Sequence, residues 1–113
     1  MFDQRGGKRF ARCEGAGIFV LKRLRDAIEH GDHIYGTIAA VGLSNDREGN
    51  LLAPASEGQL RAMRSAYQRA KWNFGDVDLI ECHATGTPVG DAVEFGSLRE
   101  LWKSTNAQTG QCV

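Results

Sequence analysis

Residues 81–94 read E-C-H-A-T-G-T-P-V-G-D-A-V-E, and this stretch decides how the chain is interpreted. It follows a short apolar run at 77–80, and it places one histidine, two threonines and two glycines in a non-repetitive turn before a new helix. An imidazole titrates near neutrality and can give a proton or a hydrogen bond to a reacting oxygen. Small residues around it let a substrate approach the backbone closely. His83 is therefore the first candidate for a residue that does chemistry.

Outward from this turn, the pattern predicts three strands that alternate with three helices, which is an α/β arrangement. Short apolar runs predict strands over residues 15–21, 34–43 and 77–82. Polar turn material at 44–50 and a helix-breaking stretch at 72–76 separate these elements. The pattern alone does not fix the directions of the strands in the sheet.

The helices are predicted from the spacing of apolar residues. Leu24 lies at the start of the first helix, and Gly31 is placed to end it. Ser56 opens the second helix, where Ser56-x-x-Gln59 predicts a capping box. The inner faces are predicted to carry Leu60, Met63, Tyr67 and Ala70 on the second helix, and Leu98, Leu101 and Trp102 on the last.

Composition excludes several classes of function. The chain has 113 residues, with 14 basic and 14 acidic side chains, so no net field favours nucleic acid or an anionic membrane. No apolar run approaches the ~20 residues that span a bilayer, and the N-terminus lacks a signal-peptide core, so we expect a cytoplasmic protein. Three cysteines without a Cys-x-x-Cys pair predict neither a disulfide framework nor a zinc site, and we expect no metal.

The setting of His83 favours a functional role over a purely structural one. A strand end followed by a glycine-rich turn and a helix start is where α/β folds place ligands. Thr85 and Thr87 alternate with Gly86, so their hydroxyls can point the same way, either toward the local backbone or toward an amide-containing ligand arm. Cys82 is interpreted as a small buried apolar residue, because neighbours on a strand point to opposite faces.

Two carboxylates follow the turn in the sequence. Asp91 and Glu94 stand three residues apart at the start of the last predicted helix. Acidic side chains in a first helical turn can accept hydrogen bonds from free N–H groups and complement the helix dipole. Helix capping therefore explains both residues, and no basic partner for Glu94 is identified within this chain.

Taken together, four segments of the chain resemble a β-ketoacyl synthase, the condensing domain of modular polyketide and fatty-acid synthases. The segments are Phe2–Gly17, Val20–Ala27, Ser44–Pro54 and, as the most specific, His83–Glu94. They cover nearly the whole chain in family order. The chain departs from the family at Cys13, where glycine is usual, and in the loop at 6–10, which is a residue longer than usual.

The resemblance implies a fold and an assembly. The family has the thiolase-like fold, an α/β fold whose two similar halves form five α-β-α-β-α layers, usually in a homodimer. Residues 1–32 would close the first half and residues 33–113 would begin the second, so the chain would be an internal fragment of one domain. The family uses a cysteine nucleophile upstream and a second histidine downstream, and neither motif is present here.

The resemblance also implies roles for single residues. His83 matches the first catalytic histidine of the family, and Thr85 and Thr87 match residues that bind the phosphopantetheine arm. Glu94 matches a glutamate that forms a structural ion pair with the lysine of the downstream motif. The enzyme would bind no cofactor of its own and would act on acyl thioesters carried by acyl carrier protein, beside other synthase domains in the same polypeptide.

Three interpretations compete. The leading one is an incomplete part of a condensing enzyme, inactive alone because its nucleophile is missing. The second is a non-catalytic subunit of the same fold, similar to a chain-length factor, that binds carrier protein. The third is a small stand-alone α/β binding protein.

Overall fold

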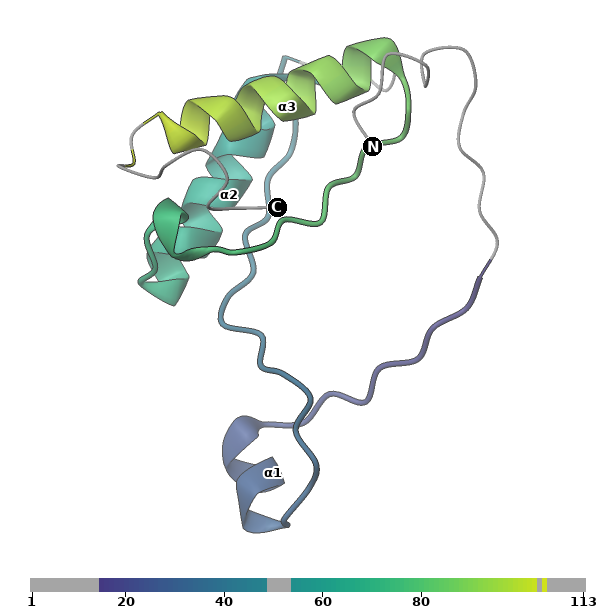
Figure 1. Cartoon of the computed structure of the whole chain (residues 1–113), viewed down its shortest axis with the longest axis vertical. Helices are drawn as coiled ribbons and strands as arrows, with labels where there is room; N and C mark the ends of the chain where they lie inside the picture. Colours follow the sequence, from purple (N-terminus) through teal and green to yellow (C-terminus); the bar gives the residue numbers. More distant parts are fainter. Residues whose placement is uncertain (1–14, 49–53, 104, 106–113) are drawn as a thin grey trace.

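The computed structural model describes residues 15–48, 54–103 and 105, and its regular elements are all helical (Figure 1). They are α1 (Leu24–Glu29), α2 (Ser56–Ala70), the 3₁₀ turn η2 (Phe74–Asp76) and α3 (Pro88–Trp102). The three predicted α-helices are therefore confirmed. None of the helices in the described part of the chain has the length and apolar character that crossing a bilayer requires.

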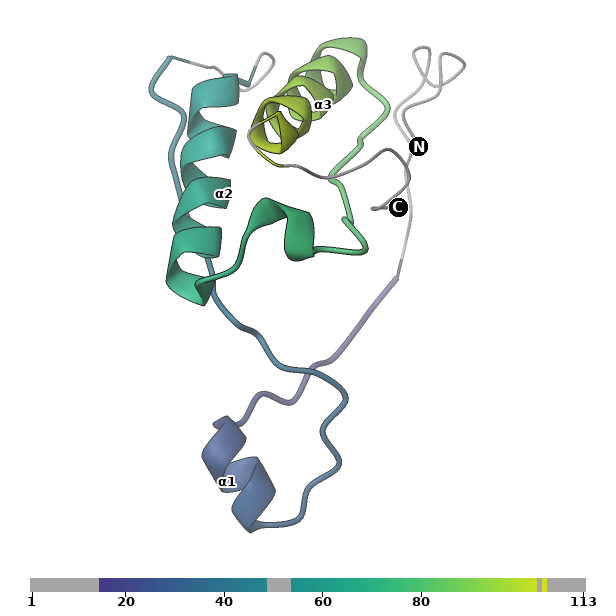
Figure 2. The same cartoon turned by 60° about the vertical axis from the view of Figure 1, so that its left-hand side comes forward.

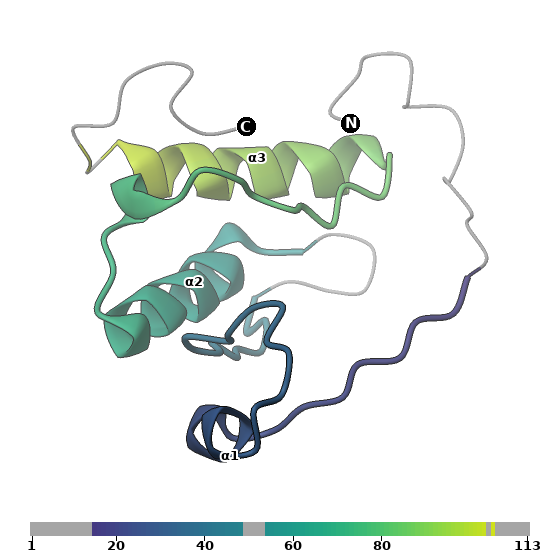
Figure 3. The same cartoon turned by 60° about the horizontal axis from the view of Figure 1, so that its bottom comes forward.

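Helices α2 and α3 pack against each other (Figures 1 and 2), and two of the four buried side chains in the described residues lie on α3. Leu101 on α3 is 1% exposed, which confirms it on the predicted inner face, and Ser97 one turn earlier is fully buried. The ring of Tyr67 meets the ring of Phe74 edge-on at 4.4 Å, which fixes η2 to the end of α2. The segment from η2 then runs back beside α3 (Figure 3). This path brings the turn of residues 83–87 to the start of α3.

Helix α1 stands apart from the helix pair, at the end of two extended segments (Figure 1). Gly31, at φ +68°, ends it as predicted. The Gly31 N–H bonds the Ile28 carbonyl at 3.1 Å and the Asp32 N–H bonds the Ala27 carbonyl at 2.9 Å, which is a Schellman motif. An ion pair between Lys22 and Asp32 joins the two segments where they leave the helix.

The three predicted strands are not formed within the described residues. Residues 15–21, 34–43 and 77–82 lie outside any regular element, and Ile18, Phe19 and Val20 are 93%, 88% and 92% exposed. A strand is defined by the hydrogen bonds it exchanges with a neighbour, and none of these segments has such a neighbour in the described part of the chain. The prediction of paired strands from residues alone was therefore wrong for this chain.

The predicted capping box at the start of α2 is also wrong. Ala55 is the N-cap residue, and no side-chain cap bond forms there. The Ser56 hydroxyl lies 2.7 Å from the Ser97 hydroxyl, and the Gln59 side-chain oxygen accepts a bond from Ser97 at 2.7 Å. Both side chains thus bind α3 instead of the N–H groups of their own helix.

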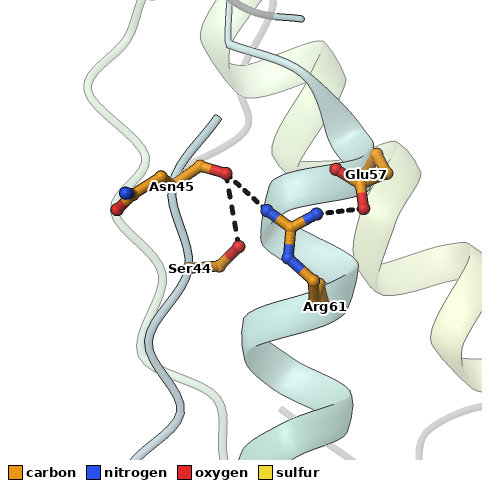
Figure 4. Close-up of polar contacts among 4 residues, drawn as sticks. All are labelled: Ser44, Asn45, Glu57 and Arg61. Carbon is orange, nitrogen blue, oxygen red and sulfur yellow. Dashed lines mark hydrogen bonds and ion pairs between the residues drawn. The ribbon is translucent and has the colours of Figure 1, made fainter. Parts of the chain in front are cut away.

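Residues 41–46 pack along α2, and hydrogen bonds run between this segment and the helix in both directions (Figure 4). Arg61 pairs with Glu57 and donates to the Asn45 carbonyl, while Asp46 accepts the Ala55 N–H at 2.9 Å, just before the helix. Gly42 lies so close to the backbone of α2 that a Cβ would collide with the Ala62 carbonyl. Helix α2 therefore fixes the end of this extended segment.

The chain is expanded for its length. Its accessible surface is 9866 Å², against about 6,100 Å² for a compact protein of this mass. Its radius of gyration is 16.7 Å, against about 13 Å for a compact domain of this size. Much apolar surface that a finished domain would cover is therefore exposed.

Candidate functional site

The turn of residues 83–87 departs from ordinary backbone geometry at two positions. Gly86 has φ +82°, which glycine adopts without strain. Ala84 has φ +36°, in a region that is uncommon for a residue with a Cβ, and it is only 5% exposed. Thr87 is the N-cap of α3 and Pro88 occupies its first turn, where the missing N–H of proline costs nothing. The turn therefore holds a shape that its own residues do not favour unaided.

Two carboxylates from the first turns of α3 hold this shape. The Glu94 oxygens accept the His83 N–H and the Ala84 N–H, both at 2.8 Å. An Asp91 oxygen accepts the Gly86 N–H at 3.1 Å. The prediction that these residues cap α3 is wrong: Thr87 is the N-cap residue, and both carboxylates instead bind N–H groups of the turn before the helix. Hydrogen bonds to a charged acceptor are the stronger kind, so the turn is pinned to α3.

The turn leaves its histidine side chain open to solvent. His83 is exposed, whereas its backbone N–H is bound by Glu94. Thr85 and Thr87 are half-buried, and their hydroxyls form a hydrogen bond with each other at 3.1 Å. Gly90 makes room for this pair, because a Cβ there would collide with the Thr87 hydroxyl. The turn therefore carries one exposed imidazole and a hydrogen-bonded pair of hydroxyls just before α3.

Cys82 precedes His83 and is half-buried, not fully buried as interpreted from the sequence. Cys13 and Cys112 lie outside the described residues. Among the residues that the structure describes, no three histidine, cysteine, aspartate or glutamate side chains gather to hold a metal ion. Glu94 has no cationic partner within 4 Å among these residues, so its predicted ion pair stays a prediction.

Sequence reasoning missed the residues that support the turn from behind. Ser97 lies one turn beyond Glu94 and binds Ser56, Gln59 and its own Val93 carbonyl, the last at 2.9 Å. The sequence held one signal for Ser97. It stands between Val93 and Leu101 at a spacing of four residues, so it is a polar residue within an apolar row of the helix. Asp46, which caps α2 from a distant segment, had no comparable signal.

A shallow hollow lies along α2, away from the histidine turn. Its lining includes both charged and apolar side chains of this helix and does not include His83. The lining residues are Ser56, Glu57, Leu60, Arg61, Arg64, Ser65 and Gln68.

Comparison with protein families identifies the larger part of the chain. Residues 35–113 match the model of the β-ketoacyl synthase C-terminal domain. Among curated relatives, the chain is 44% identical over 90 residues to a subunit of the polyunsaturated fatty acid synthase of Thraustochytrium, covering 80% of this chain and 4% of that protein. It is 41% identical over 102 residues to the polyketide synthase PksN of Bacillus subtilis, covering 89% of this chain and 2% of that protein.

Solved structures give the same result. The ketosynthase from module 6 of the bacillaene synthase of Bacillus subtilis superposes with a TM-score of 0.75 at 32% identity, covering 80% of this chain and 16% of that one. The PfaC keto synthase-chain length factor superposes with a TM-score of 0.72 at 43% identity, covering 77% and 10%. The chain therefore spans only a small part of the proteins that it matches.

Proposed function

Because this chain belongs to the β-ketoacyl synthase family, we propose that it is part of a condensing domain and supplies one of its catalytic histidines, His83. Its fold is part of the thiolase-like ketosynthase fold, as its structural neighbours share it. We further propose that residues 1–32 close the first half of that domain and residues 33–113 begin the second.

The reaction that we propose is a decarboxylative Claisen condensation. An acyl chain first passes from a carrier-protein thioester to a cysteine thiolate of the complete domain, and the carrier thiol leaves. A malonyl-type thioester then loses carbon dioxide, and the electrons of the broken C–C bond form an enolate. The enolate carbon attacks the acyl-cysteine carbonyl, and the cysteine thiolate leaves. The product is a β-ketoacyl thioester on carrier protein.

His83 would donate a hydrogen bond to the thioester oxygen of the malonyl group as negative charge gathers on it. Thr85 and Thr87 would bind the phosphopantetheine arm and place that thioester beside His83. Both oxygens of Glu94 already accept backbone N–H groups, and each keeps a lone pair for the lysine that would complete its ion pair. Acyl carrier protein, a second copy of the domain and further synthase domains would be its partners.

The observation that supports this proposal most is that the backbone of His83 is fixed while its side chain is unbound within the described part of the chain. Glu94 binds the backbone of His83, and the imidazole stays uncommitted among the described residues. A hydrogen-bond donor that must meet a developing charge works best when its support is rigid and its side chain is free for substrate. Other parts of the complete domain would exclude water from the exposed ring.

Replacing His83 in the complete protein tests the proposal. We expect His83→Ala to lower the rate of condensation by about 10²–10³-fold, the usual loss for one donor to a developing oxyanion. His30→Ala is the matched control, because His30 is an exposed histidine at the end of α1, far from the turn in the chain, and it should keep full activity. Steady-state kinetics with malonyl and acyl carrier-protein substrates make the comparison. Normal condensation by His83→Ala would refute the proposed role.

A non-catalytic subunit is the second candidate, because two structural neighbours are named as a ketosynthase together with a chain length factor. Such a subunit would keep the fold and the carrier-protein surface without using His83. A wild-type protein without condensing or decarboxylating activity, and with carrier-protein binding that His83→Ala leaves unchanged, would favour this candidate.

A further inference from the structure

Helix α3 carries the carboxylates that shape the histidine turn, so its rotation about its own axis decides where they lie. Glu94 and Ser97 stand three residues apart and share one side of the helix. A side-chain group about 5 Å from a helix axis moves roughly 2 Å when the helix turns by about 20°. Such a shift would break the two 2.8 Å bonds from Glu94 to the turn. Something must therefore fix the rotation of α3.

Apolar packing fixes it weakly. Leu101 is the one large side chain in the described residues that is fully buried, and most of the facing stripe on α2 is half-buried. Contacts between apolar side chains have no preferred direction, so they tolerate small rotations. Hydrogen bonds weaken steeply with misalignment, so a buried set of them fixes a rotation closely.

Ser97 supplies such a set. Its hydroxyl is fully buried and lies 2.7 Å from both the Ser56 hydroxyl and the Gln59 side-chain oxygen. A hydroxyl has one proton, which Ser97 can give to Gln59 or to its own Val93 carbonyl, so Ser56 donates to Ser97. Ser56 and Gln59 share one side of α2, and both form hydrogen bonds with the same atom of α3, the Ser97 hydroxyl oxygen.

We propose that Ser56, Gln59 and Ser97 form a positioning network that fixes the histidine turn, by holding α3, and Glu94 with it, in one rotation against α2. The network acts through Glu94 on the backbone of His83 and touches no substrate. Its catalytic consequence rests on the proposed condensing function, whereas its effect on the turn does not.

The test uses three variants of the complete protein. Gln59→Met keeps the length of the side chain and removes the oxygen that Ser97 binds, whereas Gln59→Glu keeps an oxygen there. Gln68→Met is the matched control, because Gln68 is an exposed glutamine at the other end of α2. Hydrogen–deuterium exchange of the peptide that covers residues 83–87 reports the turn directly, since its amides of His83 and Ala84 are bound by Glu94.

We expect Gln59→Met to speed exchange in residues 83–87 more than elsewhere in α2 and α3, and to lower kcat by about tenfold to a hundredfold with KM unchanged. Gln59→Glu should recover most of both, and Gln68→Met should match the wild type. Unchanged exchange in the turn, or a rise spread evenly over both helices, would overturn the proposal. Faster exchange in a protein that never condenses would support the network and refute the proposed function.

Discussion

Position 58 requires glycine because a neighbouring side chain leaves no space for a Cβ, and not because of its backbone conformation. It lies buried in the first turn of α2, where a Cβ would collide with an oxygen of Asp46. The same Asp46 carboxylate accepts the Ala55 N–H, so its negative charge lies at the N-terminus of α2, where it interacts favourably with the helix dipole. A side chain at position 58 would push away the group that caps the helix.

Alanine substitutions at two helical glycines should therefore have opposite effects. Gly58→Ala should destabilise the complete protein by about 1–3 kcal/mol, because it overpacks the Asp46 cap. Gly96→Ala in α3 is the matched control, since a Cβ there meets nothing within 4 Å, and it should stabilise by about 0.5–1 kcal/mol through helix propensity. Thermal denaturation of both variants measures the difference. Equal shifts of Tm would contradict the packing around Asp46.

Single residues of the site were predicted unevenly from the sequence. His83, Thr85 and Thr87 belong to one short stretch, so their arrangement in the turn follows from local chain geometry. Asp91 and Glu94 were expected to cap α3, but they bind N–H groups of the turn before the helix. Ser97 binds residues 38 and 41 positions earlier, and the local pattern marks Ser97 as a polar break in an apolar row without identifying these partners.

Two arginines hold helix α2 to the extended segment 41–46. Arg61 donates to the Asn45 carbonyl while it pairs with Glu57, and Arg69 donates to the Val41 carbonyl at 3.1 Å (Figure 4). Both carbonyls belong to a segment without strand partners in the described residues, so these bonds replace part of what a sheet would provide.

Removing one of these arginines should loosen the segment. We expect Arg61→Met to speed hydrogen–deuterium exchange in residues 41–46 by roughly fivefold, which corresponds to about 1 kcal/mol for the lost hydrogen bond. Arg64→Met is the control, because Arg64 is exposed on the same helix and has no hydrogen bond to that segment. Equal exchange in the two variants would show that packing at Gly42 alone holds the segment.

The helices were predictable and the strands were not, for one physical reason. A helix closes its hydrogen bonds within its own sequence, so apolar spacing and Gly31 place α1 well. A strand closes them with a neighbour, and the segments at 15–21 and 34–43 have none within the described residues. The capping box failed because Ser56 and Gln59 found a buried partner on α3, and tertiary contacts override a local signal.

The molecule as a whole has the fold of part of a ketosynthase, which confirms the predicted fold class. Its 9866 Å² of accessible surface and its exposed apolar segments are those of a piece whose core is shared with other parts of a domain. This expansion disfavours the interpretation as a small stand-alone binding protein.

The 113-residue chain by itself should therefore not melt cooperatively. Few of its side chains are buried among the described residues, so little apolar surface opposes the conformational entropy of unfolding. We expect a broad, shallow change of circular dichroism with temperature, and binding of a hydrophobic dye at room temperature. A sharp sigmoidal transition of a monomer would contradict this expectation and restore the stand-alone interpretation.

The left-handed backbone at Ala84 has a consequence for how the shape of the histidine turn arises. An alanine in this region lies about 1 kcal/mol or more above its relaxed conformation, and a free peptide of the same sequence would abandon it. The loop that carries the histidine would thus not keep its conformation in isolation. The carboxylates of Asp91 and Glu94 on α3 stabilise that conformation. The site is therefore formed only while the tertiary structure around it is intact.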